Sequence, residues 1–348
     1  MDKYLIIAPS WVGDAVMAQS LYRLLKQQNP SVIIDIAAPQ HCCELAGFMP
    51  EINRAFSLHF THGQFVFFAR RAKAKTFKTK AYTHAIVLPN SWKSALIPFF
   101  ARINRRIGYH GEMRFFLLND RRKLNKEKYP RMIDRFCALG IEENSTLPAK
   151  LPIPQFRIDE ITAKNVQQKF HIDDHQHTIA LCPGAEFGPT KKWPTHYYGE
   201  VARTLLQQGS QVILFGNNSD IAVTREITEY CKSHQLLYNL AGKTSLTEAV
   251  YLLSRCQKAL SNDSGLMHIA SALGIPTLVI YGSTSDQFTP PLNPEAKSIY
   301  VSNLPCRPCF KRHCPLKHMN CMNQLKPDQV IASLLQLQSA HKVPCDHS

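Results

Sequence analysis

The sequence lacks any long hydrophobic run: no apolar stretch reaches the roughly 20 residues that a membrane-spanning helix needs. Its start, residues 1–7, carries only a short apolar run and no small-residue cleavage site, which argues against a signal peptide. The composition, with 45% hydrophobic and 19% charged residues, is typical of a folded globular protein. We therefore expect a protein of the cytoplasm, in which the 11 cysteines are mostly reduced.

Acidic residues are scarce relative to basic ones: 26 Asp and Glu stand against 41 Lys and Arg, giving a net charge of +15. Most of the imbalance lies in residues 1–150, which carry 23 Lys and Arg against 11 Asp and Glu. Such an excess indicates an anionic partner: nucleic acid, phospholipid or a phosphorylated glycan. No nucleic-acid recognition motif accompanies the charge, so we do not expect nucleic acid to bind.

Two glycine-rich phosphate motifs are missing. A strand at 4–8, a helix opening at Asp14 and a strand at 32–36 form a βαβ unit without G-x-G-x-x-G, so a nucleotide need not bind there. The triplet at 242–244, Gly-Lys-Thr, lacks the upstream glycine of a P-loop, because position 237 is Leu. Neither common motif therefore marks a nucleotide site in this chain.

The length of 348 residues fits two domains, and a proline-containing stretch at 148–178 predicts the boundary. Further buried strands are expected at 85–88 in the first half and at 178–182, 211–215, 258–261 and 277–281 in the second. Helical patterns lie between them, at 159–170, from Pro194 to near Gln208 and at 246–256, and an amphipathic helix ends the pattern at 327–337. This alternation predicts an α/β fold with parallel sheets.

The stretch around Asp263, Ser264 and Gly265 is the most informative of the chain. It follows a predicted buried strand and opens a short apolar helix that ends at Gly274. Free N–H groups and the helix dipole favour an anion at such a helix start, and Gly265 allows close approach to the backbone. The alternative is that Asp263 or Ser264 only caps the helix, which needs one such residue. Because several such residues occur together, we favour a phosphate site.

A second candidate loop, residues 183–194, follows the strand at 178–182 and contains Gly184, Gly188, Lys191 and Lys192. Two lysines in a glycine-containing loop after a strand indicate diphosphate contact; the alternative is a solvated loop. In the first half, Asp14 opens a helix that follows a strand. It is either the N-cap of that helix or a carboxylate held ionised by the helix N-terminus, which suits a general base.

Residues 70–131 are strongly basic. The lysines from 73 to 80 fit a solvated face, whereas the arginines further along favour planar, bidentate contacts to carboxylate or phosphate. We expect these arginines to bind the anionic partner: Arg102, Arg105, Arg106, Arg114, Arg121 and Arg122. The aromatic pairs at 67–68, 99–100 and 115–116 predict core or a membrane-facing patch.

Four cysteines with the spacing C-x2-C-x4-C-x6-C lie near the end of the chain: Cys306, Cys309, Cys314 and Cys321. The spacing is compatible with a structural tetrahedral zinc or an iron–sulfur site, and the alternative is a loop with incidental thiols. A catalytic metal is not expected, since the cysteines lie far in sequence from the phosphate loops.

Taken in order, six motifs resemble the ADP-heptose–lipopolysaccharide heptosyltransferases of glycosyltransferase family 9, over nearly the whole chain. They are Pro-Ser-Trp-Val-Gly-Asp at 9–14, Leu-Pro-Asn-Ser at 88–91, Gly-Glu-Met-Arg at 111–114, Cys-Pro-Gly-Ala-Glu-Phe-Gly at 182–188, Lys-Trp-Pro at 192–194 and Asn-Asp-Ser-Gly-Leu-Met-His at 262–268. The resemblance implies the GT-B fold, with two Rossmann-like domains whose parallel sheets face a central cleft. It implies an acceptor-binding domain at 1–165, an ADP-heptose-binding domain at 175–325 and a C-terminal helix at 326–348 that crosses back to the first domain.

Within the family the motifs are most similar to the branch that transfers L-glycero-D-manno-heptose from ADP-heptose, with inversion, to the first heptose of the lipopolysaccharide inner core. The resemblance implies that Asp14 is the base and that Lys191, or its neighbour Lys192, holds the diphosphate. It also implies a donor site lined by Asp263, Ser264, Gly265 and His268, with Thr244 near the adenine. No cofactor is then required for catalysis, and the cysteine cluster departs from the best-known members.

From charge alone we expect the six arginines to meet the anionic Kdo and phosphate groups of the acceptor and an anionic bilayer. The protein would then be peripheral to the cytoplasmic face of the inner membrane. We also expect a monomer. Two other hypotheses remain: a heptosyltransferase I or another family 9 enzyme, and a non-enzymatic basic protein that binds nucleotides or nucleic acid. Activity assays with a set of different acceptors would distinguish another family 9 enzyme from our prediction. Steeply salt-dependent binding to nucleic acid would indicate the non-enzymatic protein.

Overall fold

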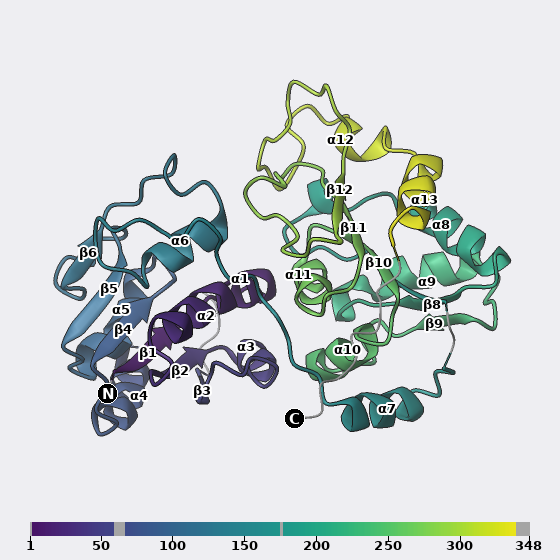
Figure 1. Ribbon diagram of the computed structural model, residues 1–348. Helices are drawn as coiled ribbons and strands as arrows, with labels where there is room; N and C mark the ends of the chain where they lie inside the picture. The colour runs from purple at the N-terminus through teal and green to yellow at the C-terminus, as the bar shows by residue number, and fades with distance from the viewer. Residues whose placement is uncertain (1, 59–66, 175–176, 339–348) are drawn as a thin grey trace. The chain divides into compact units, whose positions relative to one another are not determined.

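The computed structural model describes residues 2–58, 67–174 and 177–338 (Figure 1). The chain divides into two compact units, Met1–Arg157 and Ile158–Ser348, here called unit 1 and unit 2. Each unit contains one six-stranded sheet in which every pair of neighbouring strands is parallel. The predicted α/β fold with two Rossmann-like parallel sheets is confirmed.

Unit 1 has the strand order β3-β2-β1-β4-β5-β6. Its strands are β1 (Lys3–Ile7), β2 (Ile33–Ala38), β3 (Arg54–Ser57), β4 (His84–Val87), β5 (Arg105–Tyr109) and β6 (Asp120–Arg122). Its helices are α1 (Val12–Met17), α2 (Gln19–Gln28), α3 (Gln40–Ala46), α4 (Phe67–Lys78), α5 (Trp92–Phe100) and α6 (Met132–Ala138).

The central strands of unit 1 are apolar on both faces because helices cover both. Leu5 and Ile7 of β1 and Val87 of β4 share one core with Phe77 of α4 and Ile97 of α5. Helices α1, α2 and α6 pack on one another elsewhere in the unit. Parallel strands that are buried on both faces have near-continuous hydrophobic sequences. These strands could therefore be predicted from the sequence.

Unit 2 has the strand order β12-β11-β10-β7-β8-β9. Its strands are β7 (Thr178–Cys182), β8 (Gln211–Leu214), β9 (Leu237–Asn239), β10 (Lys258–Asn262), β11 (Thr277–Ile280) and β12 (Lys297–Ile299). Its helices are α7 (Glu160–Lys169), α8 (Thr195–Gln207), α9 (Ile221–Tyr230), α10 (Leu246–Leu253), α11 (Gly265–Ala272), α12 (Asn320–Asn323) and α13 (Pro327–Leu335), with short 3-10 turns η1 (Pro189–Lys191) and η2 (Asn218–Asp220).

Both units therefore follow the same winding. The first strand of each unit lies in the middle of its sheet, beside the fourth: β1 beside β4, and β7 beside β10. In open α/β sheets of this kind, ligands bind outside the carboxyl ends of the strands at the point where the winding reverses. The fold thus predicts ligand binding at four loops, those that follow β1, β4, β7 and β10.

Two details differ from the sequence-based expectations, and a third is not tested. The helix expected from Asp14 onward is two helices, α1 and α2, separated at Ala18. The predicted limit of the first domain at 165 would divide α7, which belongs to unit 2, where Arg255 forms an ion pair with Glu160. Helix α13 packs on α8 in unit 2. That the C-terminal segment crosses back to the first domain stays a prediction, because residues 339–348 lie outside the described part.

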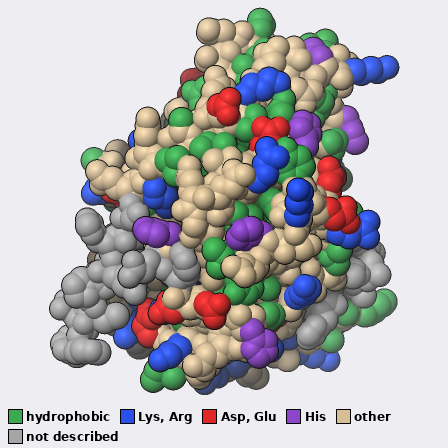
Figure 2. Space-filling model, turned by 90° about the vertical axis from the view of Figure 1, so that its right-hand side faces the viewer, with side chains coloured by type: hydrophobic (Ala, Val, Ile, Leu, Met, Phe, Trp, Pro, Cys, Tyr) green, Lys and Arg blue, Asp and Glu red, His purple; other side chains and the backbone are tan. Residues whose placement is uncertain are grey.

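None of the helices described in the structure is long and apolar enough to span a bilayer. Figure 2 shows one face of the molecule, on which basic and acidic side chains are interspersed. The net charge of the chain is therefore not spread as one continuous positive field over every face.

Candidate active site

The loops after β7 and β10 meet through a buried ion pair. Lys191, in η1 after β7, places its Nζ 2.6 Å from Oδ2 of Asp263, directly after β10. The Asp263 carboxylate is 3% exposed, and its Oδ2 also accepts a hydrogen bond of 2.6 Å from the hydroxyl of Thr284. Two segments predicted separately to contact phosphate are thus joined at the reversal point of the unit 2 sheet.

The two neighbouring lysines have different surroundings. Lys191 faces Asp263, and its Nζ also lies 5.1 Å from the centre of the Phe187 ring. Lys192 instead places its Nζ 3.5 Å from Oδ1 of Asp220, at the end of η2. Of the two, Lys191 is the one that pairs with another predicted donor-site residue, Asp263.

The start of α11 has no side-chain cap. Ser264 is the N-cap residue, yet its side chain makes no capping hydrogen bond; its hydroxyl lies 3.3 Å from that of Ser261. Asp263 is engaged by Lys191 and Thr284. The first-turn N–H groups, which include that of Gly265, are therefore not occupied by a capping side chain. The capping alternative does not describe this loop, and the anion-binding interpretation remains.

Sequence reasoning missed two residues that organise this site. Asn262 is buried; its Oδ1 accepts hydrogen bonds from the backbone N–H of Trp193 and the Tyr198 hydroxyl, and its Nδ2 donates to the carbonyl of Pro183. It thereby fixes both ends of the loop that carries Lys191. Thr284 was missed too, although a polar Gly-Ser-Thr-Ser run at the end of the predicted strand 277–281 was the available signal.

His268 lies on α11 and is only 5% exposed. Burial lowers its pKa to about 4; the nearby Asp263 carboxylate opposes this shift, and Lys191 adds to it. The imidazole is therefore neutral at physiological pH. A neutral ring offers a donor and an acceptor nitrogen for hydrogen bonding to a bound donor molecule.

We expect His268 to make folding stability depend on pH in the window between about pH 6.5 and 4. There the unfolded chain binds a proton on this ring and the folded chain does not, so stability falls as the pH falls. The full shift corresponds to about 3 kcal/mol in the free energy of unfolding. Urea unfolding of His268→Asn at several pH values should show a flatter dependence than the parent, whereas exposed His313→Asn should not. Equal slopes for all three proteins would contradict the assignment.

Thr244 lies in the loop that follows β9, half-buried. The N–H of Gly242 in that loop donates to the carbonyl of Gly216, in the loop after β8. Thr244 thus stands at the same carboxyl edge of the sheet as Lys191 and Asp263, but none of the described contacts links it to them. Its placement near an adenine stays a prediction.

In unit 1, Asp14 lies in α1, the helix that follows β1. The N-cap of α1 is Trp11, so Asp14 is the third helical residue and not the cap, which removes one of the two alternatives. The carboxylate lies in the first helical turn, where the dipole favours its ionised form. It also lies near the thiol of Cys42, whose pKa is raised to about 12 by burial first, then by Cys43 and Asp14.

The loop after β4, Pro89 to Ser91, is held by the side chain of Arg114. This arginine is 2% exposed and donates hydrogen bonds to the carbonyls of Pro89 and Tyr109 and to Oδ1 of Asn90. Burial lowers the pKa of its guanidinium to about 10, so it remains charged at neutral pH. Arg114 thus shapes the carboxyl end of β4 and offers little surface to a ligand.

Three further arginines of the predicted acceptor-binding set are bound internally. Arg105 pairs with Asp120 and Glu142. Arg106 donates to the carbonyls of Leu117 and Ile103. Arg122 is 6% exposed and donates to the carbonyls of Ala138 and Ile141 and to Asp120.

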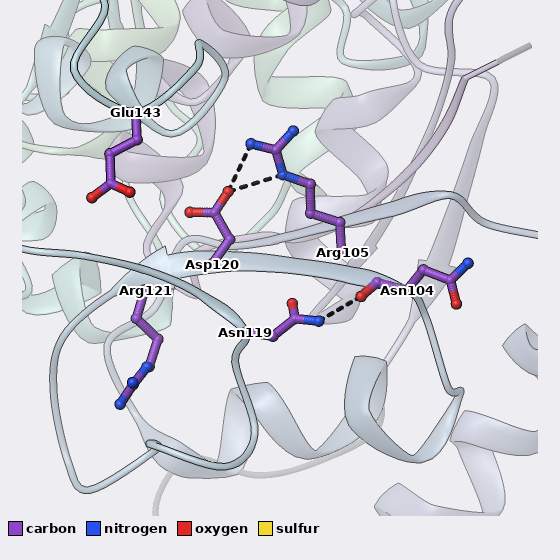
Figure 3. A pocket seen from close by; sticks show the side chains of 6 residues that line it. All are labelled: Asn104, Arg105, Asn119, Asp120, Arg121 and Glu143. Atoms are coloured by element: carbon purple, nitrogen blue, oxygen red, sulfur yellow. Dashed lines mark hydrogen bonds and ion pairs between the residues drawn. The ribbon is translucent and has the colours of Figure 1, made fainter.

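The expectation that all six arginines meet the acceptor is therefore not supported at four of the positions, and for Arg102 and Arg121 it stays a prediction. Four of them hold strands and loops of unit 1, and only Arg102 and Arg121 are exposed. A polar hollow of about 460 Å³ lies beside some of these residues (Figure 3). It is lined by Asn104, Arg105, Asn119, Asp120, Arg121 and Glu143. Since Arg105 and Asp120 begin β5 and β6, the hollow lies at the edge of the sheet opposite to Asp14.

The four cysteines near the end of the chain, Cys306, Cys309, Cys314 and Cys321, are free thiols. They lie close enough for the first three to contribute to the raised pKa of Cys321, after burial as the main cause. Across the described residues, however, no group of three or more His, Cys, Asp or Glu side chains is placed to hold a metal ion. The geometry thus gives the predicted metal site no support, and the site stays a prediction.

Two doubly wound units, each with polar loops at the reversal point of its sheet, are typical of the GT-B fold. The chain belongs to glycosyltransferase family 9 (heptosyltransferase), whose family model matches residues 70–320.

Named relatives support this placement. The chain is 44% identical over 304 residues to lipopolysaccharide heptosyltransferase 2 of Salmonella typhimurium, covering 85% of this chain and 87% of that one. It is 42% identical to lipooligosaccharide heptosyltransferase 2 of Haemophilus ducreyi, covering 96% and 99%. The structure of E. coli ADP-heptose lipopolysaccharide heptosyltransferase II superposes with a TM-score of 0.86 at 39% identity, covering 97% and 98%. The predicted resemblance is confirmed.

Proposed function

We propose that the chain is a heptosyltransferase II, which transfers L-glycero-D-manno-heptose from ADP-heptose to the first heptose of the lipopolysaccharide inner core. The observation that carries the proposal is the Lys191–Asp263 pair beside the uncapped start of α11, at the reversal point of the unit 2 sheet. This is where a diphosphate would find a cation and free N–H groups together. The lipopolysaccharide acceptor is supported by the names of relatives that are 44% and 42% identical over the aligned residues, and ADP-heptose by the name of the E. coli structure.

The reaction proceeds as a single displacement with inversion. The acceptor hydroxyl oxygen attacks the anomeric carbon of the heptose, and the bond from that carbon to the diphosphate oxygen breaks. ADP leaves with the bonding electron pair, and the hydroxyl proton passes to the Asp14 carboxylate. The transition state resembles an oxocarbenium ion, as in glycoside hydrolysis. Asp14 suits the role because it sits in the first turn of α1, where a carboxylate stays ionised.

Negative charge builds on ADP as the bond breaks, and unit 2 supplies positive charge at that point. Lys191 and the N–H groups at Ser264 and Gly265 stabilise the diphosphate, without need of a divalent ion. Asp263 and Thr284 orient the lysine ammonium through the shared Oδ2 atom. Asn262 keeps the lysine loop in register with β10. On the acceptor side, Arg102 and Arg121 are the remaining candidates for contacts to anionic sugar and phosphate groups.

The test is release of ADP by the purified protein from ADP-heptose, in the presence of EDTA. We expect turnover with an acceptor that carries Kdo and one heptose, and none with the heptose-free Kdo acceptor. Turnover only on the heptose-free acceptor would identify a heptosyltransferase I instead. No turnover with either acceptor, from a protein that still binds ADP, would contradict the substrate assignment. Inhibition by EDTA would contradict the metal-independent mechanism.

A further inference from the structure

The segment between β12 and α12, residues 300–319, contains no helix or strand, and the structure describes all of it (Figure 1). We call it the β12–α12 segment. It carries three of the four clustered cysteines, and the proposed reaction so far gives it no role. Hydrogen bonds nevertheless fix its middle part to the loops of the candidate active site.

Thr190, the residue before Lys191 in η1, forms the first attachment. Its side chain is buried, and its hydroxyl donates a hydrogen bond of 2.5 Å to the carbonyl of Lys311. The carbonyl oxygen of Arg312 lies 3.2 Å from the same hydroxyl. The β12–α12 segment therefore lies directly against the turn that carries Lys191.

The loop after β11 forms a second attachment. The Ser283 hydroxyl donates a hydrogen bond of 3.0 Å to the Thr190 hydroxyl, and the carbonyl of Ser283 accepts one of 2.8 Å from the N–H of Phe310. Nearby, Nε of Arg307 donates a hydrogen bond of 3.1 Å to the carbonyl of Gly282. Three segments that are far apart in the sequence are thus joined at the carboxyl edge of the unit 2 sheet.

Gly188 allows the two backbones to approach closely. A Cβ atom at this position would lie 2.7 Å from the carbonyl oxygen of Arg312, closer than real Cβ contacts, and the φ angle of Gly188 is 150°. Glycine is the residue that fits such a close approach and such a backbone angle. The glycine noted in the sequence thus seats the β12–α12 segment on the lysine loop.

The seated segment brings the guanidinium of Arg312 to the same aromatic ring as Lys191. Cζ of Arg312 lies 5.5 Å from the centre of the Phe187 ring, and Nζ of Lys191 lies 5.1 Å from it. Such distances are typical of cation–π contacts. Arg312 is exposed, and no carboxylate in the described ranges forms an ion pair with it. A cation without a carboxylate partner therefore lies beside the paired Lys191.

The charges of the two phosphate loops show why such a cation matters. Lys191 is paired with Asp263, and Lys192 faces Asp220. Glu186, in the same loop as the lysines, adds a further carboxylate. The charge of each lysine is thus offset by a carboxylate, and these five side chains together carry no net positive charge. A diphosphate bound there requires positive charge from another side chain as well as from the N–H groups of α11.

We propose that the guanidinium of Arg312 binds the diphosphate of the donor together with Lys191. The inference rests on the proposed function for the identity of this anion, and it adds a residue from outside the two phosphate loops. A guanidinium presents its N–H groups in a planar fork that matches phosphate oxygens. A diphosphate is several ångströms long, so it can accept hydrogen bonds from both cations beside the Phe187 ring.

The role of Arg312 in the reaction is electrostatic. When the bond between the anomeric carbon and the diphosphate oxygen breaks, ADP keeps the electron pair, and the charge on its diphosphate grows. The guanidinium stabilises that charge through hydrogen bonds, and no proton passes to or from it. Arg312 should therefore contribute to the binding of ADP and, to a larger extent, to the rate of transfer.

Binding of ADP to the full-length variant Arg312→Gln tests the proposal. Titration calorimetry should show ADP binding at least about tenfold weaker than in the parent, because a charge-assisted contact to phosphate is lost. Arg312→Lys should retain part of the affinity, since it keeps the charge without the planar fork. Adenosine, which has no phosphate, should bind the parent and Arg312→Gln equally. The variants should fold, because the β12–α12 segment is attached through the backbone carbonyl of Arg312 and not through its side chain.

The matched control is Lys311→Gln, which removes a positive charge from the exposed neighbouring residue and should leave the affinity for ADP as it is in the parent. Equal ADP affinity in the parent and Arg312→Gln, or an equal loss in Lys311→Gln, would overturn the proposal. So would an equal loss of adenosine binding in Arg312→Gln, because it would indicate a deformed pocket and not a lost phosphate contact.

These titrations need neither heptose nor acceptor, so they separate this proposal from the proposed function. Weaker ADP binding in Arg312→Gln, from a parent that transfers heptose to no acceptor, would support the role of Arg312 and contradict the proposed function alone. Heptose transfer by the parent, with the same ADP affinity in Arg312→Gln, would contradict the role of Arg312 alone.

Discussion

Replacing Asp14 by Asn lowers heptose transfer by roughly 10²- to 10⁴-fold while ADP binding is kept, if Asp14 is the general base. The amide has the shape of the carboxylate but cannot accept the proton of the acceptor hydroxyl. ADP should still bind, because the proposed donor contacts all lie in unit 2. Transfer is measured as steady-state ADP release, and ADP binding is measured by titration calorimetry.

The carboxylate of Glu44, on the helix α3 that packs on α1, supplies the control for charge alone. Glu44 lies on α3, two residues after Cys42, whose thiol lies close enough to Asp14 to respond to its charge. Glu44→Gln should retain turnover within a few-fold of the parent if the effect at Asp14 is chemical. Retained turnover in Asp14→Asn, or a comparable loss in Glu44→Gln, would remove Asp14 from the role of base.

The sequence predicted the buried strands well because parallel strands covered by helices on both faces are continuous apolar runs. The strand expected at 178–182 is β7 itself, and those at 258–261 and 277–281 agree with β10 and β11 to within one residue. The strands β5 and β6 were missed, because two arginines open β5 and the three residues of β6 are all charged. The same arginines were interpreted as a ligand surface, whereas their guanidinium groups mostly bind carbonyls and carboxylates of their own unit.

Residue types at the carboxyl ends of strands were the reliable signal for the site. Asp263 and Lys191 were named from two loops 72 positions apart, and the parallel pairing of β7 with β10 brings those loops together. The sequence could not show that Thr284 completes the same cluster or that Asn262 anchors the lysine loop. Both contacts depend on which loops the fold makes neighbours, and no local pattern encodes that choice.

The second large effect is expected at Lys191. Lys191→Ala should lower kcat/KM by roughly 10²- to 10³-fold, because it removes the cation that meets the charge developing on the leaving diphosphate. Lys192→Ala is the matched control: it removes the same charge one position away, from a lysine that faces Asp220. Its loss should be much smaller. Steady-state kinetics of the two variants at saturating acceptor measure the difference.

Stability has to be separated from catalysis in this comparison. Lys191→Ala leaves the Asp263 carboxylate buried with only Thr284 as a described partner, and breaking such a buried pair costs about 3–5 kcal/mol. Adding Asp263→Asn should restore much of the thermal stability, because it removes the unpaired charge, but it should not restore turnover. Recovery of turnover in the double variant would mean that Lys191 acts only through folding. A larger loss of kcat/KM in Lys192→Ala than in Lys191→Ala would assign the diphosphate to Lys192, the alternative that the sequence alone left open.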